Sequence, residues 1–137
     1  MIDLTTDFGR RADQRLKDED VIWLTTVTLD GVAQPNPIWF YWNGDAIILY
    51  SQPGSYRIRN IQHNRMVTLN LQGAGVLGTD VVVIIGEASL KFDYPQVHPG
   101  YETKYRIYLP EMSLTYQQLK EEYSVEITVH PTKLRGN

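Results

Sequence analysis

Two turn dipeptides, Asp30-Gly31 and Asn43-Gly44, stand between runs of β-branched and aromatic residues, and they constrain the fold more than any other feature of the sequence. Each dipeptide accepts the positive φ angles of a tight hairpin turn. The flanking runs cover residues 21–28, 37–42 and 46–50, and each has the composition of a strand. We therefore expect three consecutive strands that form an antiparallel meander.

The rest of the chain adds three strands and several short helices. Alternation and β-branched residues predict strands over 66–71, 80–92 and 123–129; the strand over 80–92 is expected to be the longest, with a bulge at Gly86. Helices are expected over 7–17, from a cap at Ser55 through His63, and over 113–122. Because no strand–helix–strand repetition occurs, the predicted fold class is mostly β with short helices. We expect a small antiparallel barrel of about six strands, in a single domain spanning 1–137.

The size and charge of the chain exclude several functional classes. Its 137 residues fit one domain, and a formal net charge of −3 gives no general attraction for nucleic acid or an anionic membrane. No stretch reaches the ~18 consecutive apolar residues of a membrane-spanning helix. Cysteine is absent, which excludes disulfides, thiol catalysis and cysteine-bound metals. We expect a cytoplasmic protein with no nucleic-acid or membrane partner.

The common sequence motifs for dinucleotide binding, metal binding and catalysis do not predict a site in this chain. The glycines of 73–78 match the GxGxxG pattern of dinucleotide-binding proteins. Residues 81–85 predict a strand where that motif needs a helix, so we expect a hairpin loop instead. His63, His98 and His130 are far apart in the sequence and lack metal-ligand spacing, so no metal site is expected. The sequence has no nucleophile elbow, P-loop or recognisable carboxylate pair, and it identifies no catalytic residue.

One segment, residues 50–61, has the features of a phosphate-binding site. A strand, a hydroxyl-rich turn and a helix start converge there, and the amides and positive dipole of a helix N-terminus favour an anion. The residue pattern equally fits a capped surface helix with solvated arginines, and it leaves both interpretations open. The candidate residues, which supply hydroxyl, amide or guanidinium donors, are Tyr50, Ser51, Gln52, Ser55, Arg57 and Arg59.

A longer series of motifs resembles a known family. In chain order the motifs are Leu24-Thr25-Thr26-Val27, Asp30-Gly31, Gln34-Pro35-Asn36-Pro37-Ile38-Trp39-Phe40, Tyr50-Ser51, Arg57-Ile58-Arg59-Asn60-Ile61 and Asn64-Arg65-Met66-Val67. Together they resemble the pyridoxamine 5′-phosphate oxidase-like, FMN-binding split-barrel superfamily, and most closely its deazaflavin (coenzyme F420)-dependent oxidoreductase branch. The resemblance covers about residues 24–71 well and the remainder in strand order.

The resemblance implies a fold and a cofactor site. The fold would be a six-stranded antiparallel split β-barrel that forms a homodimer, with the cofactor in the groove between the subunits. The cofactor phosphate would meet Ser51, Ser55 and Arg57, with Arg59 as a helper. From its composition, we expect the tyrosine-rich segment around 101–108 to be the contribution of the second subunit. The cofactor ring would lie against the backbone of the second strand, at Asn36, Pro37, Ile38 and Trp39.

Two departures from the family pattern bear on the activity. Arginine stands at position 57, where lysine is commoner, and either side chain neutralises a phosphate. Pyridoxamine phosphate oxidases carry basic residues on the second strand, where this chain has Pro35 or Asn36 and Phe40. We therefore do not expect authentic pyridoxamine phosphate oxidase activity.

The expected function is that of an oxidoreductase that transfers a hydride between a deazaflavin (coenzyme F420) or flavin cofactor and a small organic acceptor. Such a cofactor carries the hydride itself, so the protein does not strictly need an acid–base pair. Two alternatives keep the fold. One is an FMN-binding stress-type flavoprotein, and the other is a non-catalytic module that binds a flavin, a deazaflavin or haem.

Overall fold

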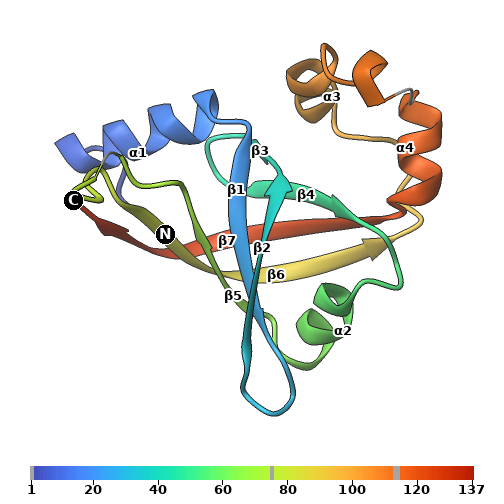
Figure 1. Cartoon of the computed structure of the whole chain (residues 1–137), viewed down its shortest axis with the longest axis horizontal. Coiled ribbons are helices and arrows are strands. Elements are labelled where there is room, and N and C mark those ends of the chain that lie inside the picture. Colours follow the sequence, from blue (N-terminus) through green and yellow to red (C-terminus); the bar gives the residue numbers. More distant parts are fainter. Residues whose placement is uncertain (1, 75, 113–114) are drawn as a thin grey trace.

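The computed structural model describes residues 2–74, 76–112 and 115–137, which form one antiparallel sheet flanked by short helices (Figure 1). The strands are β1 (Val21–Val27), β2 (Ala33–Trp39), β3 (Tyr41–Trp42), β4 (Ile47–Ser51), β5 (Met66–Asn70), β6 (Val82–Phe92) and β7 (Val125–Gly136). The helices are α1 (Asp7–Asp18), α2 (Tyr56–His63), α3 (Pro99–Tyr105) and α4 (Tyr116–Glu122), with a 3₁₀ helix at Pro110–Met112. The prediction of a mostly β chain with short helices is confirmed.

The strands lie in the order β2-β1-β5-β6-β7-β4-β3, so β2 and β3 are the two edges of an open seven-stranded sheet. Only Phe40 separates these two strands in the chain. The predicted meander, with one strand over 37–42, is therefore wrong: β2 pairs with β1, with Trp39 opposite Val21, whereas β3 pairs with β4. Phe40 leaves the ladder because its amide bonds to the Tyr105 hydroxyl of α3. This break raises the strand count from the expected six to seven.

The pair β6 and β7 forms the long centre of the sheet. With 12 residues, β7 exceeds the 11 of β6, so the expectation that the 80–92 strand is the longest is wrong by one residue. The last strand, expected over 123–129, continues to Gly136. The register between β6 and β7 shifts at Ile85/Gly86, which confirms the predicted bulge. A Cβ at Gly86 would lie 2.7 Å from the His130 carbonyl oxygen, so the bulge requires glycine.

The helix predicted from a cap at Ser55 is confirmed, whereas the helix expected over 113–122 begins only at Tyr116. Ser55 is the N-cap of α2, and its Oγ accepts a hydrogen bond from the Arg57 amide at 3.3 Å. The helix expected over 113–122 is α4, which follows a capping box at Thr115; residues 113 and 114 lie outside the described residues.

The described residues of the glycine-rich segment 73–78 lie in a loop between β5 and β6 and open no helix, as expected. Ala74 and Thr79 exchange backbone hydrogen bonds of 2.7 and 3.1 Å, and β6 begins three residues later at Val82. Gly75 lies outside the described residues.

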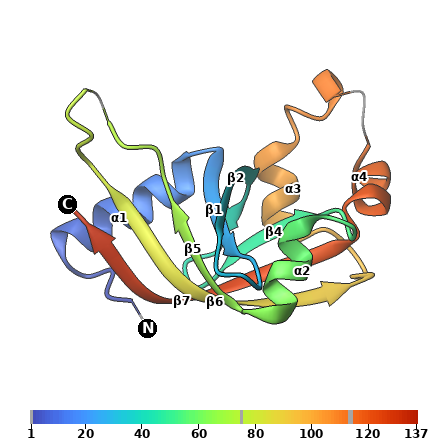
Figure 2. The ribbon, with the colours of Figure 1, turned by 60° about the horizontal axis from the view of Figure 1, so that its bottom comes forward.

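Two groups of buried side chains hold these elements together. The larger group packs α1 and α2 against the sheet and includes Leu16, Ile22 and Leu49. The second, here called the tyrosine cluster, joins α3 and α4 to β4 at one end of the sheet (Figure 2). It consists of Ile48, Tyr50, Tyr94, Val97, Tyr101, Tyr105 and Leu119.

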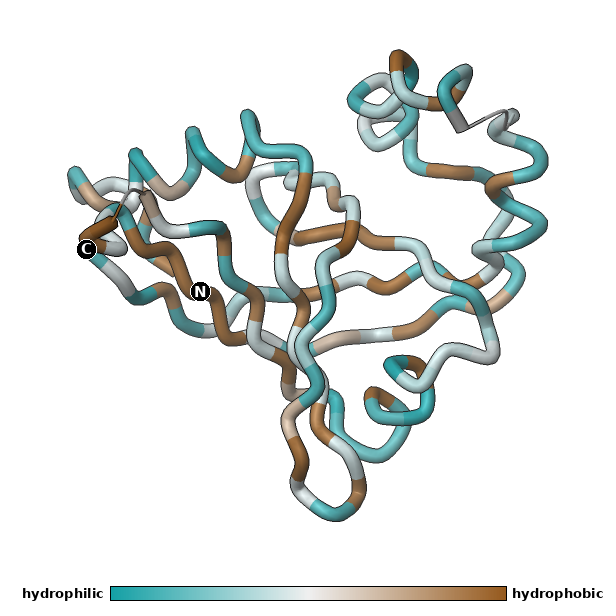
Figure 3. Tube along the Cα trace, viewed as in Figure 1, coloured by the Kyte–Doolittle hydropathy of each residue, from teal (hydrophilic) through white to brown (hydrophobic). Residues whose placement is uncertain are grey.

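The apolar residues concentrate in the strands, whereas the helices alternate apolar and hydrophilic positions (Figure 3). No helix in the described ranges is long and apolar enough to cross a bilayer.

Candidate functional site

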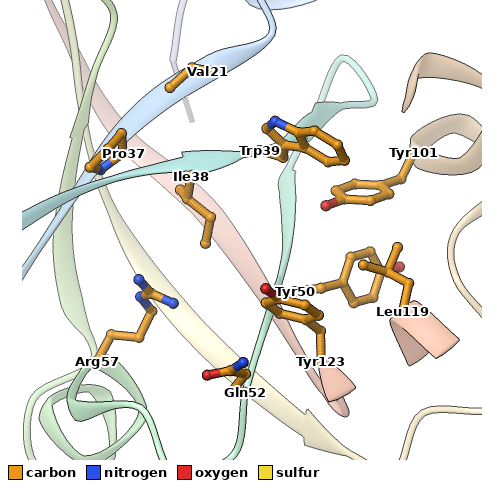
Figure 4. Close-up of a pocket in the computed structure, with 10 residues that line it drawn as sticks. All are labelled: Val21, Pro37, Ile38, Trp39, Tyr50, Gln52, Arg57, Tyr101, Leu119 and Tyr123. Atoms are coloured by element: carbon orange, nitrogen blue, oxygen red, sulfur yellow. The ribbon is translucent and has the colours of Figure 1, made fainter. Parts of the chain in front are cut away.

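A cavity of about 490 Å³ lies between the edge strand β2, the end of β4, the first turn of α2 and the helices α3 and α4 (Figure 4). Among the described side chains that line it, Arg57 alone carries a charge at neutral pH. The cavity therefore combines an apolar, aromatic wall with one cationic group. The lining residues are Val21, Pro37, Ile38, Trp39, Tyr50, Gln52, Arg57, Tyr101, Leu119 and Tyr123.

The guanidinium of Arg57 is the polar centre of this cavity. Its Nη1 donates to the Oγ of Ser51 at 3.3 Å, and Ser51 is fully buried at the end of β4. Its Nε is buried and has no hydrogen-bond partner in the part of the chain that the structure describes. A buried donor without an acceptor costs about 1–3 kcal/mol. An anionic ligand at this position would supply the missing acceptor, so the residues fit a phosphate.

The turn before α2 brings further polar groups to the same end of the cavity. Ser55 uses one lone pair of its hydroxyl to cap α2 and keeps its proton available for a ligand. Gln52 lines the cavity directly. Arg59 is exposed on α2 and does not line the cavity, so the structure does not bring the proposed helper to Arg57.

The second strand contributes three of its four predicted residues to the cavity, namely Pro37, Ile38 and Trp39. Asn36 instead turns toward α2, where its Nδ2 donates to the Tyr56 hydroxyl at 2.5 Å. The hydrogen bond of Asn36 therefore joins β2 to the first turn of the helix that carries Arg57.

Tyr50 presents its ring to the cavity, but its hydroxyl already has two partners. It donates to the Oε2 of Glu126 at 2.8 Å and accepts from the His98 amide at 2.7 Å. Burial raises the pKa of Tyr50 well above its ordinary value. This hydroxyl therefore fixes the start of α3 and is not free to bind a ligand.

Three lining residues were missed from the sequence: Val21, Leu119 and Tyr123. The tyrosine-rich segment was predicted to contribute from a second subunit, and in the structure Tyr101 lines the cavity of its own chain. Its ring meets that of Tyr50 edge to face, at 4.7 Å and 84°. The high tyrosine content of 101–108 was a signal in the sequence for an aromatic wall. No sequence feature indicated that α4 packs against β4.

The wall also offers hydroxyl groups that face the cation. Figure 4 shows the hydroxyls of Tyr101 and Tyr123 on the side of the cavity toward Arg57. Burial raises the pKa of Tyr101 well above its ordinary value, so its hydroxyl stays protonated near neutral pH. The described residues contain no cluster of metal-ligating side chains. The cavity therefore combines one guanidinium with phenol hydroxyl groups and an aromatic wall.

Comparison with known proteins identifies the family. The family model for pyridoxamine 5′-phosphate oxidase matches residues 8–135. The chain belongs to this family. The resemblance inferred from the motifs of 24–71 is thereby confirmed. No curated protein matches the chain in sequence.

Solved structures show the same fold at low sequence identity. An F420 reductase is 21% identical with a TM-score of 0.66, over 90% of this chain and 94% of that one. A conserved hypothetical protein from Mycobacterium tuberculosis is 17% identical with a TM-score of 0.71, over 98% and 86% of the two chains. A FAD-binding protein from Mesorhizobium loti is 14% identical with a TM-score of 0.63, over 91% and 90%. At these low identities the comparisons show that the chain shares the fold of these proteins.

Proposed function

We propose that this member of the pyridoxamine 5′-phosphate oxidase family is an oxidoreductase that transfers a hydride between a bound deazaflavin or flavin and a small organic acceptor. The observation that carries the proposal is the buried, unpartnered Nε of Arg57 in the cavity wall, as far as the described residues extend. A cofactor phosphate would complete its hydrogen bonding. An F420 reductase and a FAD-binding protein among the similar structures support a cofactor of this class.

In this proposal the cofactor supplies the chemistry, and the chain binds the cofactor and shields it from water. The cofactor, when bound, would supply the hydride chemistry. Arg57 and Ser51 would bind its phosphate, and Trp39 and Tyr101 would cover the planar ring and exclude water from it. The aromatic lining and the absence of an acid–base pair among the ten lining residues agree with a site that holds two planar molecules together.

We further propose that a second copy of the chain completes the cavity. Val21 lines the cavity and yet is 42% exposed. At the far end of the same β1–β2 hairpin, outside the cavity lining, Leu29 and Val32 are 79% and 57% exposed. A homodimer that covers the length of this hairpin would bury these apolar side chains and shield a ring bound beside Val21 from water. Light scattering of the protein and of a Leu29→Asp/Val32→Asp variant, each titrated with cofactor, tests this. Full cofactor affinity in a verified monomer would overturn the shared site.

The phosphate site is tested by calorimetric titration of the apoprotein with FMN and with coenzyme F420. Arg57→Ala should weaken binding of the preferred cofactor by about 1.5–3 kcal/mol, roughly 10- to 150-fold, because a charged contact is lost. Arg59→Ala is the matched control, since the same charge is removed from an exposed position on the same helix. Equal affinity in Arg57→Ala and the unaltered protein would contradict the site.

A carrier or sensor is the second candidate function, because the same aromatic cavity with its one guanidinium would also hold a cofactor without turnover. Such a module would bind a flavin, a deazaflavin or haem at one site per chain without turnover. Reduction of a panel of quinones, enones and nitroaromatics by the loaded protein would support the oxidoreductase, and stoichiometric binding without reduction would support the carrier. A yellow protein that retains FMN would instead match the stress-type flavoprotein.

A further inference from the structure

Three aromatic rings in contact lead from the cavity to the surface of the protein. Trp39 lines the cavity (Figure 4), and its indole stacks on the Tyr105 ring with a centroid distance of 4.3 Å and an interplanar angle of 5°. The centroid of the Tyr108 ring lies 5.9 Å from that of Trp39 and 6.4 Å from that of Tyr105. Tyr108 is partly exposed, so the three rings connect the cavity to solvent.

Rings at these separations exchange single electrons rapidly, because electron tunnelling weakens steeply with the gap between donor and acceptor. In a chain without cysteine, tryptophan and tyrosine are the side chains that one-electron oxidants oxidise most easily. An oxidised Trp39 would therefore recover an electron from Tyr105 or from Tyr108. The surroundings of each phenol decide which of the two supplies it.

Tyr108 is the better electron donor, because a tyrosine that loses an electron also gives up its phenol proton. The hydroxyl of Tyr108 donates to the Oδ2 of Asp20 at 2.7 Å, and this carboxylate can take the proton. The hydroxyl of Tyr105 faces the backbone carbonyl oxygens of Asp20 and Phe40, which cannot. The Lys104 ammonium, 5.2 Å from the centroid of the Tyr105 ring, further disfavours positive charge on that ring.

A second tyrosine of the cavity wall, Tyr50, also has a carboxylate partner. Its hydroxyl donates to the Oε2 of Glu126 at 2.8 Å. The ring contacts that join Trp39 to Tyr50 pass through two tyrosines of α3, whereas Trp39 meets Tyr108 directly. Tyr50 is also only 3% exposed, so an electron could not be supplied to it from solvent by contact. The direct route to the surface therefore ends at Tyr108.

We propose that Trp39, Tyr105 and Tyr108 form a one-electron path that carries an oxidising equivalent from the cavity to the surface. The path is separate from the proposed hydride transfer, which moves electrons in pairs. A one-electron oxidant in the cavity, such as an oxygen-derived radical, takes an electron from Trp39. Tyr108 returns an electron to Trp39 and passes its phenol proton to Asp20. A small thiol at the surface then restores Tyr108 with one electron and one proton, and Asp20 releases its proton to water.

Pulse radiolysis of the protein without cofactor tests the path with azide radical, a one-electron oxidant that reacts with tryptophan in preference to tyrosine. Absorbance of the indolyl radical should decay while that of a phenoxyl radical grows, at a rate independent of protein concentration. Tyr108→Phe should lower this rate at least about tenfold, because the final electron donor is removed. Tyr116→Phe is the matched control on α4, outside the three rings, and should leave the rate unchanged. An unchanged rate in Tyr108→Phe would overturn the path.

Three further variants locate the start of the path and its proton step. Trp39→Phe should abolish the rapid growth of the phenoxyl radical, whereas Trp23→Phe, on β1, should retain it. Asp20→Asn should slow the transfer, because the proton of Tyr108 loses its acceptor. Equal rates in Trp39→Phe and Trp23→Phe, with circular dichroism showing both folded, would overturn the proposed start.

A nitroso spin trap, followed by mass spectrometry of the unaltered protein, identifies the residue on which the radical comes to rest. The label should lie on Tyr108, and a label on Tyr50 instead would overturn the exit at the surface. None of these measurements requires a bound cofactor, so failure of the path would leave the proposed function standing.

Discussion

The hydroxyl of Tyr105 lies 2.8 Å from the amide nitrogen of Phe40 and 2.7 Å from its carbonyl oxygen. Phe40 is the residue at which the chain passes from one edge of the sheet to the other. The same hydroxyl lies 2.7 Å from the Asp20 carbonyl, so its single proton is shared between two acceptors. Helix α3 therefore stabilises the break between β2 and β3 at Phe40, the residue after the cavity-lining Trp39.

Tyr105→Phe should destabilise the protein by about 1–3 kcal/mol, because it leaves the buried amide of Phe40 without an acceptor. Urea denaturation measures the free energy of unfolding. Tyr108→Phe is the control, because it removes a hydroxyl that bonds to the Asp20 side chain at the exposed surface. A loss no larger in Tyr105→Phe than in Tyr108→Phe would show that the hydroxyl does not hold the break.

The strand break marks the limit of what the sequence predicts about the fold. Turn dipeptides, the Ser55 cap and the Gly86 bulge are local features, and the structure confirms each of them. The break at Phe40 depends on a hydroxyl 65 residues away, so residues 37–42 read as one strand until the tertiary structure is known.

The same distinction between local and distant contacts applies to the cavity. Arg57 and Ser51 were predicted together, since six residues of strand, turn and helix start determine their contact. Leu119 and Tyr123 reach the cavity only because the tyrosine cluster draws α4 toward β4. No residue pattern near either of them encodes that contact.

Gly86→Ala should destabilise the protein by about 1–3 kcal/mol, because a methyl group there meets backbone that cannot move freely. The added Cβ would lie 2.7 Å from the His130 carbonyl oxygen and 2.8 Å from the Val129 Cγ1. Gly54→Ala is the matched control, because a Cβ at Gly54 has nothing within 4 Å. Thermal or urea unfolding should separate the two variants, and equal stability would contradict the tight fit at the bulge.

Lys104 should titrate near pH 8. Burial lowers the pKa of its amine to about 8, and the negative charges of Asp20 and Glu19 act against this lowering. The Nζ of Lys104 also donates a hydrogen bond to the Phe40 carbonyl at 2.8 Å. Because the pKa is lower in the folded than in the unfolded chain, folding disfavours the ammonium, and this group's contribution to stability rises between about pH 8 and 10.5. Competitive acetylation followed by mass spectrometry gives the midpoint for each lysine. A midpoint for Lys104 equal to that of exposed Lys91 would contradict the burial effect.

Above pH 10 the tyrosine cluster should dominate the pH dependence of stability in the opposite direction. Burial raises the pKa of Tyr94 to about 12 and raises those of Tyr101 and Tyr105 as well. A phenol whose folded pKa is raised contributes stability below its unfolded pKa, and that contribution is lost as pH rises from about 10 toward 12. We expect tyrosinate absorbance to rise in two steps, with the exposed phenols first and the cluster only when the chain unfolds.

Circular dichroism followed over the same titration should show unfolding together with the second step. In Tyr94→Phe the free energy of unfolding should fall less steeply with pH, because one raised pKa has been removed. A single smooth titration centred near pH 10, with the secondary structure intact, would mean that water reaches these hydroxyls and that α3 and α4 do not pack on β4 as described.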